Sequence, residues 1–285
     1  MRPGRHVALT FWLGLIATLL AALPAFGPWM DPRLNLLLPI DDAKNHLLRL
    51  YHFLWLLERG EWYPRWVPDM FMGYGYPLLN FYAPGFYYLA AGVRLIFRTD
   101  IWDTLKLSGL TAALLGTAGL YALTHALWRR VLPAAFGALL LAYGPYVFQV
   151  NLWRRAALPE ALALGIVPWL LLSLYRAWHA PPGQRLLWSV AGAGAGAALF
   201  LAHNLTAMAG FGMAAVWVAS LAVQSGLQRG DWRSAAGALA PLALAVGLSS
   251  FFWMPAIAEG RLVHLEELWG TGGLDWHGCS LSPPA

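Results

Sequence analysis

The chain has 285 residues, of which 59% are hydrophobic and only 12% are charged. An ordinary soluble domain has about 25% charged residues, so a soluble protein of this composition could not cover its surface with polar groups. Intrinsic disorder requires low hydrophobicity, and a disulfide scaffold requires more than the single Cys279, so both classes are excluded. A membrane protein with many spans remains. Its net charge of +5 then indicates basic loops beside the membrane and no nucleic-acid partner.

The first apolar run covers residues 7–26, directly after two arginines. It is as long as a membrane span, which needs about 20 apolar residues. A cleaved signal peptide is the alternative, but its apolar region would be shorter, and residues 23–25 (Leu-Pro-Ala) are a poor cleavage site. We therefore interpret this run as an uncleaved first span.

Residues 27–106 form a long amphipathic stretch that holds most of the acids and a dense aromatic run. Within this stretch, residues 78–97 are apolar enough to cross the membrane, but Pro84 and Gly85 interrupt them and Arg94 lies among them. The later apolar runs are separated by short, mostly basic breaks. They cover residues 107–127, 131–150, 159–178, 186–203, 205–224 and 236–256.

The distribution of basic residues indicates the side on which each loop lies, because lysine and arginine are enriched in inner loops. If residues 78–97 stay outside, the chain has seven spans, with eight arginines inside and three in the short outer loops. If they cross, the partition of basic residues falls to seven against six. We therefore predict an all-α membrane protein of about seven spans with an inner amino terminus. Residues 78–97 then form a juxtamembrane or re-entrant helix on the outer side.

This topology makes residues 1–258 a single integral-membrane domain, with a long first outer loop of juxtamembrane helices at 27–106. Residues 259–285 become a short polar outer tail. The same topology brings ionisable side chains from separate loops to the outer membrane face, and such groups at span ends indicate a functional site. These side chains are Asp41, Asp42, Glu160, His203 and Glu259.

The segment from Asp41 to Arg49 carries the strongest local pattern. If a helix begins near Asp42, then Asp42, His46 and Arg49 lie near one face by their i, i+4, i+7 spacing. An aspartate at a helix start often serves only as an N-cap. With a second acid, a histidine and an arginine beside it, the carboxylate can instead accept a proton from an attacking hydroxyl. A third interpretation is a metal site that uses Asp42 and His46 as ligands.

Aromatic residues crowd positions 61–88, together with prolines and glycines that fix a folded loop. One interpretation is an interfacial belt, with tryptophan and tyrosine at headgroup depth. The other is a binding surface, since flat apolar faces with polar edges suit sugar rings and isoprenoid tails. The candidate lining residues in this stretch are Tyr63, Arg65, Trp66, Tyr74, Tyr76 and Tyr82.

A pair of arginines, Arg154 and Arg155, lies between two later spans. Their outer position opposes the bias of basic residues toward the inner side, and arginine there suits a phosphate ligand. Pro159 and Glu160 follow at a helix start, where helix capping by itself explains them. Further candidates for lining a site at span ends are His203, Asn204 and Glu259.

Seven short motifs in this order carry a resemblance to a known family. They are Asp42…His46…Arg49, Gly60…Tyr63-Pro64-Arg65-Trp66, Gly73-Tyr74-Gly75-Tyr76-Pro77, Phe81-Tyr82-Ala83-Pro84, Arg155…Pro159-Glu160, His203-Asn204 and Trp253…Pro255…Glu259. Together they resemble the bacterial 6-pyruvoyl-tetrahydropterin-synthase-related membrane domain, a family that belongs with the GT-C-type glycosyltransferases. The resemblance covers nearly the whole chain. Its most specific block runs from residues 63–66 to residues 81–84.

The resemblance implies an inverting glycosyltransferase of the bacterial inner membrane. Such an enzyme moves a sugar from a polyprenyl-phosphate donor to an acceptor hydroxyl on the outer face, so its partners are the lipid bilayer and the lipid-linked sugar. By position, the resemblance makes Asp42 the catalytic acid, with Asp41 and Glu160 as further catalytic candidates. The donor phosphate would be held by Arg49, Arg154 and Arg155, and His46 would line the site. A divalent cation could share the phosphate role.

Members of that family are longer than this chain, so we expect a truncated member. The alternatives that the sequence leaves open are an inactive fragment of the enzyme and a non-catalytic membrane protein, such as a lipid carrier, a transporter subunit or an assembly scaffold. Transporters tend to have repeated halves and helices broken at the membrane midplane. The sequence has no apparent repeat, and its acids gather at one face, which favours the enzyme.

Overall fold

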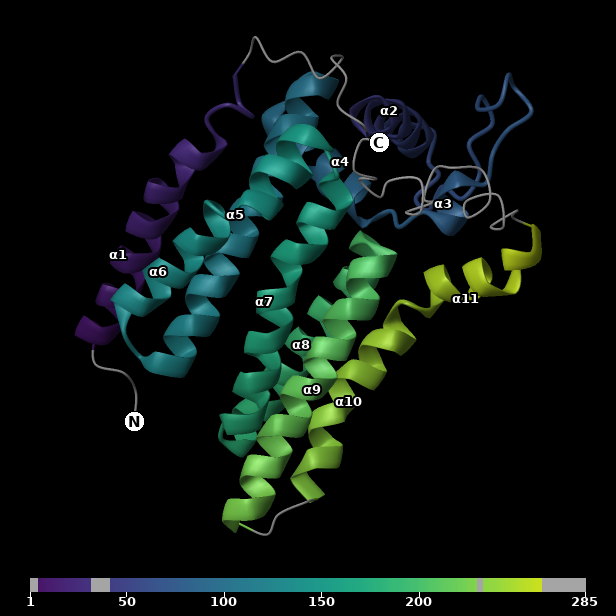
Figure 1. Ribbon diagram of the computed structural model, residues 1–285. Helices are drawn as coiled ribbons and strands as arrows, with labels where there is room; N and C mark the ends of the chain where they lie inside the picture. The colour runs from purple at the N-terminus through teal and green to yellow at the C-terminus, as the bar shows by residue number, and fades with distance from the viewer. Residues whose placement is uncertain (1–4, 32–41, 230–232, 263–285) are drawn as a thin grey trace, which may run out of the picture.

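The computed structural model describes residues 5–31, 42–229 and 233–262, and this part of the chain is almost entirely helical (Figure 1). The bundle is built from α1 (Arg5–Ala22), α5 (Ile101–Trp128), α6 (Val131–Ala142), α7 (Leu158–His179), α8 (Pro182–Ala202), α9 (Asn204–Arg229) and α10 (Arg233–Leu248). The shorter elements are η1 (Leu23–Phe26), α2 (Ala43–Glu58), α3 (Leu78–Phe81), α4 (Gly85–Phe97), η2 (Pro145–Arg154), α11 (Ser250–Ala258) and η3 (Gly260–Leu262). The prediction of the all-α class is confirmed.

Five helices are long and apolar enough to cross a membrane: residues 8–26, α5, α7, α8 and residues 204–225 of α9. Two bent pairs, α6 with η2 and α10 with α11, raise the number to seven if each pair forms one span. The chain is therefore a polytopic membrane protein, as its composition predicts. The expected count of seven spans requires both bent pairs to cross.

Residues 78–97 form two short helices rather than one span. Helix α3 ends at Phe81, and Pro84 occupies the position just before α4. Helix α4 has 13 residues, which reach about 20 Å, whereas the hydrocarbon layer is about 30 Å thick. A Cβ atom at Gly85 would lie 2.5 Å from the carbonyl oxygen of Leu201, so this glycine allows α4 to pack directly on the end of α8. The geometry agrees with a juxtamembrane placement of this segment.

The structure bends two runs that the sequence leaves uninterrupted, 131–150 and 236–256. Helices α6 and η2 meet at 42°, after an extended Gly144 that precedes Pro145. Helices α10 and α11 meet at 64° around Ser249 (Figure 1). A bend frees helix carbonyls, and here the Ser249 hydroxyl donates to the carbonyl of Ala245 at 2.9 Å while the Trp253 indole donates to that of Val246 at 2.9 Å. Side chains therefore stabilise the second bend.

Helices α5 and α7 form the closely packed centre of the bundle. A Cβ atom at Gly165 would lie 2.6 Å from the carbonyl oxygen of Ala112, and one at Gly116 would lie 3.0 Å from the Gly165 Cα. The Trp169 indole crosses the interface and donates to the carbonyl of Leu115 at 2.9 Å. Small residues that let helix backbones approach are the usual means of packing within a membrane.

Helix α1 packs against this centre rather than lying apart from it. The Tyr121 hydroxyl donates to the carbonyl of Phe11 at 3.1 Å, and the Tyr143 hydroxyl donates to that of Ala21 at 2.9 Å. Gly14 lies directly under the Tyr121 hydroxyl. These contacts make α1 part of the folded bundle, as expected of a first span.

The two ends of the bundle differ in charge. We call the end that carries α2, α3 and α4 the α2 end, and the opposite end, where α5 ends and α6 begins, the Arg129 end (Figure 1). Every described aspartate and glutamate lies at the α2 end, whereas the Arg129 end has Arg129, Arg130, Arg176 and Arg185. The predicted gathering of Asp42, Glu160, His203 and Glu259 at one end is therefore confirmed, and Asp41 lies outside the described residues.

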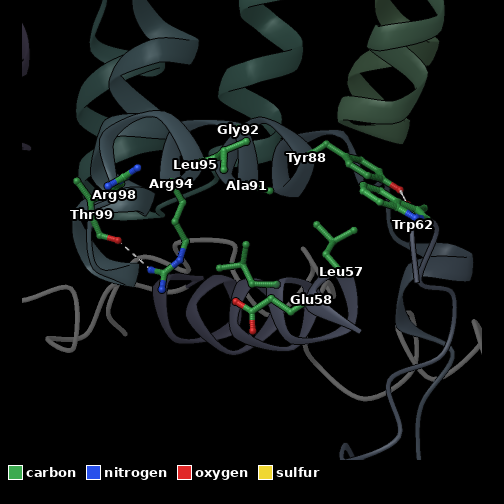
Figure 2. A pocket seen from close by; sticks show the side chains of 11 residues that line it. Leu57, Glu58, Trp62, Tyr88, Ala91, Gly92, Arg94, Leu95, Arg98 and Thr99 are labelled. Carbon is green, nitrogen blue, oxygen red and sulfur yellow. Dashed lines mark hydrogen bonds between the residues drawn. The ribbon is translucent and has the colours of Figure 1, made fainter. Parts of the chain in front are cut away.

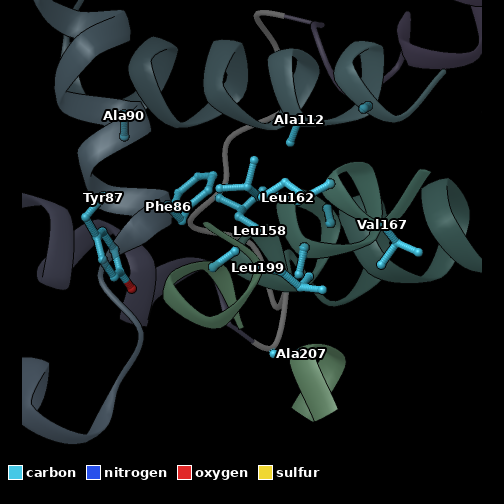
Figure 3. Close-up of a cluster of buried hydrophobic side chains, with 14 of the residues drawn as sticks. Phe86, Tyr87, Ala90, Ala112, Leu158, Leu162, Val167, Leu199 and Ala207 are labelled. Carbon is cyan, nitrogen blue, oxygen red and sulfur yellow. The ribbon is translucent and has the colours of Figure 1, made fainter. Parts of the chain in front are cut away.

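An apolar cluster lies directly beneath the α2 end and joins α4, α5, α7, α8 and α9 (Figure 3). Phe86, Leu158 and Leu199 are almost completely buried in it. Tyr87 lies at its edge, with its hydroxyl pointing away from the apolar side chains (Figure 3). The cluster thus provides a rigid base for polar groups at the α2 end.

Candidate functional site

The start of α2 is fixed to the loop before α7. The backbone N–H of Asp42 donates to the carbonyl of Arg155 at 2.9 Å, and the carbonyl of Asp42 accepts from the N–H of His46 at 3.0 Å. The predicted helix with Asp42, His46 and Arg49 on one side is present. Asp42 occupies the N-cap position, but its half-buried carboxylate makes no capping hydrogen bond, so the interpretation of Asp42 as a simple N-cap is wrong. The carboxylate is left available for another partner.

His46 is buried one turn further along α2. Its Nδ1 and the Tyr87 hydroxyl are 2.9 Å apart, and its ring is 1% exposed and faces the rings of Phe86 and Tyr87. Burial lowers the pKa of His46 to about 3, with smaller contributions from the charges of Arg49 and His203. His46 is therefore neutral at physiological pH, and its buried Nε2 has no hydrogen-bond partner among the described residues.

Arg49 lies over an aromatic surface beside His46. Its guanidinium carbon is 4.2 Å from the centre of the Tyr82 ring, a cation–π distance. Burial raises the pKa of both the Tyr82 and Tyr87 hydroxyls, and the nearby charge of Arg49 only partly offsets this. Both hydroxyls therefore stay protonated. Since a guanidinium can only donate, its position beside Tyr87 favours the orientation in which that hydroxyl donates to His46 Nδ1.

The two adjacent arginines have different environments. Arg155 donates from Nη1 to Glu160 at 3.0 Å and to Asn151 at 3.1 Å, while the other Glu160 oxygen accepts from the Tyr146 hydroxyl at 2.7 Å. Both oxygens of Glu160 are thus occupied. Arg154 is exposed and makes no hydrogen bond or ion pair with the described residues. Of the pair, only Arg154 is free to bind an added anion without breaking an existing contact.

His203 closes the other side of the site, at the junction of α8 and α9. Its Nδ1 accepts from the backbone N–H of Thr206 at 3.3 Å and contacts the Thr206 hydroxyl at 2.8 Å. Burial lowers the pKa of His203, the charge of Glu160 opposes this and that of Arg155 adds to it. Next to it, the Asn204 amide donates to the carbonyl of Phe81 at 3.3 Å, which ties this junction to α3.

These contacts bring most of the predicted catalytic and phosphate-binding residues into one group. The charge of His203 acts on His46, and the charges of Asp42 and Glu160 both act on Tyr82. We call this group the polar cluster; it consists of Asp42, His46, Arg49, Tyr82, Tyr87, Arg155, Glu160 and His203.

A second group ties the end of α11 to the outer loop. Arg65 donates from Nε to the side-chain oxygen of Asn80 at 2.8 Å and from Nη2 to Glu259 at 3.4 Å. Asn80, which is buried, donates in turn to the second Glu259 oxygen at 2.6 Å. Arg65 and Glu259 therefore have a structural partner in each other, and they hold the bent α11 against α3.

The remaining aromatic candidates lie on the outer loop rather than in the polar cluster. Trp66, Tyr74 and Tyr76 belong to a turn closed by backbone hydrogen bonds between Val67 and Tyr76, and the Tyr74 side chain is 85% exposed. Tyr63 packs edge-on against Phe251, with ring centres 5.2 Å apart. These residues form an exposed aromatic surface at the α2 end. In the described part of the chain, no hydrogen bond or ring contact joins any of them to Asp42.

A groove of about 680 Å³ separates the second half of α2 from α4 (Figure 2). Its walls are mainly apolar, with Leu57 on one side and Leu95 on the other, and Glu58, Arg94 and Arg98 stand at its rim. No residue predicted from the sequence lines this groove. It is a separate feature of the juxtamembrane helices.

Sequence reasoning missed four residues that organise these groups. Tyr87 and Asn80 lie in the aromatic stretch that the sequence singles out, but nothing in their spacing distinguishes them from their neighbours. Tyr146 and Asn151 contact Glu160 and Arg155 from η2. Tyr146 lies within the apolar run 131–150, which the sequence analysis interprets as a span, and Asn151 directly follows that run. A polar residue at the end of a span, as Asn151 is, is a signal for a functional site.

A metal site receives no support from this geometry. Within residues 5–31, 42–229 and 233–262, no three histidine, cysteine, aspartate or glutamate side chains come together as a metal-binding group. His46 already uses Nδ1 for Tyr87 and has its Nε2 buried. The arrangement of Asp42 with His46 therefore favours a free carboxylate beside a neutral histidine.

The fold and the polar cluster define a helical polytopic membrane protein with an ionisable site at one end of its bundle. Residues 79–268 match the model of the family described as a 6-pyruvoyl-tetrahydropterin synthase related domain, a membrane protein, and the chain belongs to that family. Comparison with curated proteins and with solved structures gave no match. The matched segment includes Tyr82, Arg155, Glu160 and His203, while the segment with Asp42 precedes it.

Proposed function

We propose that this protein is a GT-C-type inverting glycosyltransferase that uses a polyprenyl-phosphate-linked sugar at the outer face of the bacterial inner membrane. One observation carries the proposal: the half-buried Asp42 carboxylate stands at a helix start without capping it, and its charge acts on Arg49 and Tyr82. An acid whose carboxylate makes no hydrogen bond with the described residues, and whose charge acts on Arg49, is suited to general base catalysis. The resemblance of the motifs to the glycosyltransferase family supports the same role.

In the proposed reaction, the acceptor oxygen forms a bond to the anomeric carbon while the bond from that carbon to the phosphate oxygen breaks. The acceptor proton passes to the Asp42 carboxylate, and polyprenyl phosphate leaves with the electron pair. Attack from the face opposite the leaving group inverts the anomeric centre. Negative charge grows on the phosphate as it leaves. Cations that are already in position stabilise this charge in the transition state and so raise the rate.

Arg49 and Arg154 are the best candidates for the phosphate. Arg154 is exposed and unpaired within the described part of the chain, and Arg49 is held flat on Tyr82. Arg155 is paired with Glu160 at 3.0 Å, so its charge is largely committed to the structure. In this proposal Arg155 and Glu160 position the start of α2 through the Arg155 carbonyl, and Asp41 next to Asp42 is a second acid.

The charge of the Arg129 end supports the proposed orientation. Basic residues favour the inner side of a membrane, and the Arg129 end has seven described arginine positions (Arg5, Arg129, Arg130, Arg176, Arg185, Arg229 and Arg233) with no described acid. The start of α1, at the same end as Arg129, is then inside. The polar cluster is outside, where lipid-linked sugars can meet an acceptor.

Replacement of Asp42 tests the proposal. Asp42→Asn keeps the size of the side chain and removes the base, so release of polyprenyl phosphate from labelled polyprenyl-phosphate sugars should fall by about 10²–10⁴-fold. Asp69→Asn, which removes an exposed acid of the outer loop, is the matched control and should keep the wild-type rate. Full activity of Asp42→Asn would exclude the base role. Absence of turnover by the wild-type chain with every sugar donor tried would favour the non-catalytic carrier or scaffold.

A further inference from the structure

The Arg129 end carries positive charge that no described acid neutralises. Arg129 follows the last residue of α5, exposed and in a left-handed conformation with φ of 57°, and Arg176 lies one turn before the end of α7. The two positive charges are near enough to act on each other and on His125. No described aspartate or glutamate lies at this end. A neighbouring anion would therefore be attracted strongly.

Arg176 is the more enclosed of the two arginines. Its guanidinium carbon lies 5.7 Å from the centre of the Trp188 ring on α8, and its Nε atom is buried without a hydrogen-bond partner among the described residues. A buried, charged donor that lacks an acceptor is costly, because it has given up water without gaining a hydrogen bond. No hydrogen bond or ion pair with the described residues therefore satisfies the Arg176 guanidinium, and its charge is left for a neighbouring anion.

The side chains around Arg129 and Arg176 indicate that the two arginines lie at the depth of lipid headgroups. Exposed apolar side chains flank the arginines on three helices, namely Trp128 at 61%, Leu132 at 82% and Leu186 at 75%. Tryptophan and arginine near the ends of membrane helices lie at the headgroup level. Helix α8 also begins at this end, and the partial positive charge of its amino terminus attracts anions. The anion available at that depth in the membrane is a lipid phosphate.

We propose that Arg129 and Arg176 form a binding site for the phosphate of an anionic phospholipid, with Trp188 as one wall. The guanidinium of Arg176 provides paired N–H donors, which match phosphate oxygens and which a point charge does not reproduce. The site lies at the opposite end from the polar cluster, so it is independent of the proposed transfer reaction. It would hold a structural lipid of the leaflet that faces the Arg129 end.

Native mass spectrometry of the purified full chain, titrated with phosphatidylglycerol or with phosphatidylcholine, tests this site. We expect phosphatidylglycerol to bind, and Arg176→Gln and Arg129→Gln each to weaken its binding by about tenfold. Arg130→Gln, which removes the same charge from an exposed neighbour, should reduce binding by less than about twofold. Arg176→Lys should behave more like Arg176→Gln than like wild type, because the paired donors are lost.

Three results would overturn the proposal. Equal loss in the Arg130→Gln and Arg176→Gln variants would mean a diffuse basic surface, and equal binding of phosphatidylcholine would mean no preference for anionic lipid. Displacement of the lipid by inorganic phosphate at comparable concentration would mean a site for free phosphate. If Arg176→Gln cannot be purified, the rise in melting temperature on adding phosphatidylglycerol to Arg129→Gln and to Arg130→Gln gives the same comparison, and an equal rise in both contradicts the site.

Discussion

The α2 end and the Arg129 end differ in whether acids of the same chain lie near their arginines. At the α2 end, two arginines pair with acids of the same chain, as Arg155 does with Glu160 and Arg65 with Glu259, although Arg154 stays exposed. At the Arg129 end, Arg129 and Arg176 have no described acid near them. We infer from this difference that the arginines of this chain have two separate purposes. One set is organised by the fold into a site, and the other is left for the surroundings to neutralise.

The comparison extends to single residues within the α2 end. Asp100 and Asp42 both precede a helix, but only Asp100 caps it, by accepting from the N–H groups of Trp102 at 2.8 Å and Asp103 at 2.9 Å. Asp42 leaves its helix uncapped. An aspartate that makes no capping hydrogen bond, at the same kind of position as one that does, supports our proposal that Asp42 acts in the polar cluster.

The largest expected effect is a loss of folding stability at low pH, and it should arise from His46 at the α2 end. The pKa of His46 in the folded protein is about 3, below its ordinary value of 6.5. As the pH falls, the unfolded chain therefore takes up a proton before the folded one does. The stability linked to His46 is fully present above about pH 6.5 and is lost progressively toward pH 3, by about 2–3 kcal/mol between about pH 7.5 and about pH 4.5.

Melting temperatures of the protein in detergent, measured across this pH range, test the expectation. His46→Gln should be less sensitive to acid than wild type, because it removes the group that titrates. His179→Gln, an exposed histidine at the Arg129 end, should follow the wild-type curve. An unchanged acid sensitivity in His46→Gln would show that the loss of stability comes from other groups.

The next effect is a loss of stability from a substitution between α5 and α7, at the centre of the bundle. The Cβ atom added by Gly165→Ala would lie 2.6 Å from the carbonyl oxygen of Ala112. This is too close for the two atoms, so α5 and α7 must separate. Overpacking of this kind costs about 1–3 kcal/mol, which a fall in melting temperature would reveal. Gly194→Ala is the control, since nothing lies within 4 Å of the added carbon. Equal behaviour of the two variants would contradict close packing at the centre of the bundle.

The smallest effect separates the two aspartates. Asp100→Ala should destabilise the protein by about 1 kcal/mol, because the first turn of α5 loses its cap. Asp42→Ala should leave the melting temperature nearly unchanged, because α2 has no side-chain cap to lose. A similar loss for Asp42→Ala would show that its carboxylate does serve the helix after all.

The sequence predicts the fold class and the gathering of the site more fully than it predicts contacts. Hydrophobic run lengths and the i, i+4, i+7 spacing of Asp42, His46 and Arg49 depend on local periodicity, and both are present in the structure. The bend of 64° at Ser249 has no such local signal, because the apolar run continues through it. The length of this run predicts a span. The bend within it depends on two backbone carbonyls that accept hydrogen bonds from side chains.

Side-chain partners far apart in the chain were beyond the reach of spacing arguments. His46 meets Tyr87 across 41 residues, and Asn80 meets Glu259 across 179 residues. The packing of α2 against α4 and the return of α11 toward α3 bring these pairs together. The exposed aromatic turn at residues 67–76 shows the same limitation, since its composition predicts a folded loop but not that the loop stands away from the polar cluster.

The account rests on the two ends facing opposite sides of the membrane, with the polar cluster outside. Single cysteines in a background without Cys279 test this directly with a membrane-impermeant thiol reagent on intact cells. Asp103→Cys, exposed at the α2 end, and Trp128→Cys, 61% exposed at the Arg129 end, are suitable positions. We predict labelling of the cysteine at position 103 and protection of the one at position 128 until the cells are opened. Labelling at position 128 with protection at position 103, or labelling of both in intact cells, would contradict the account.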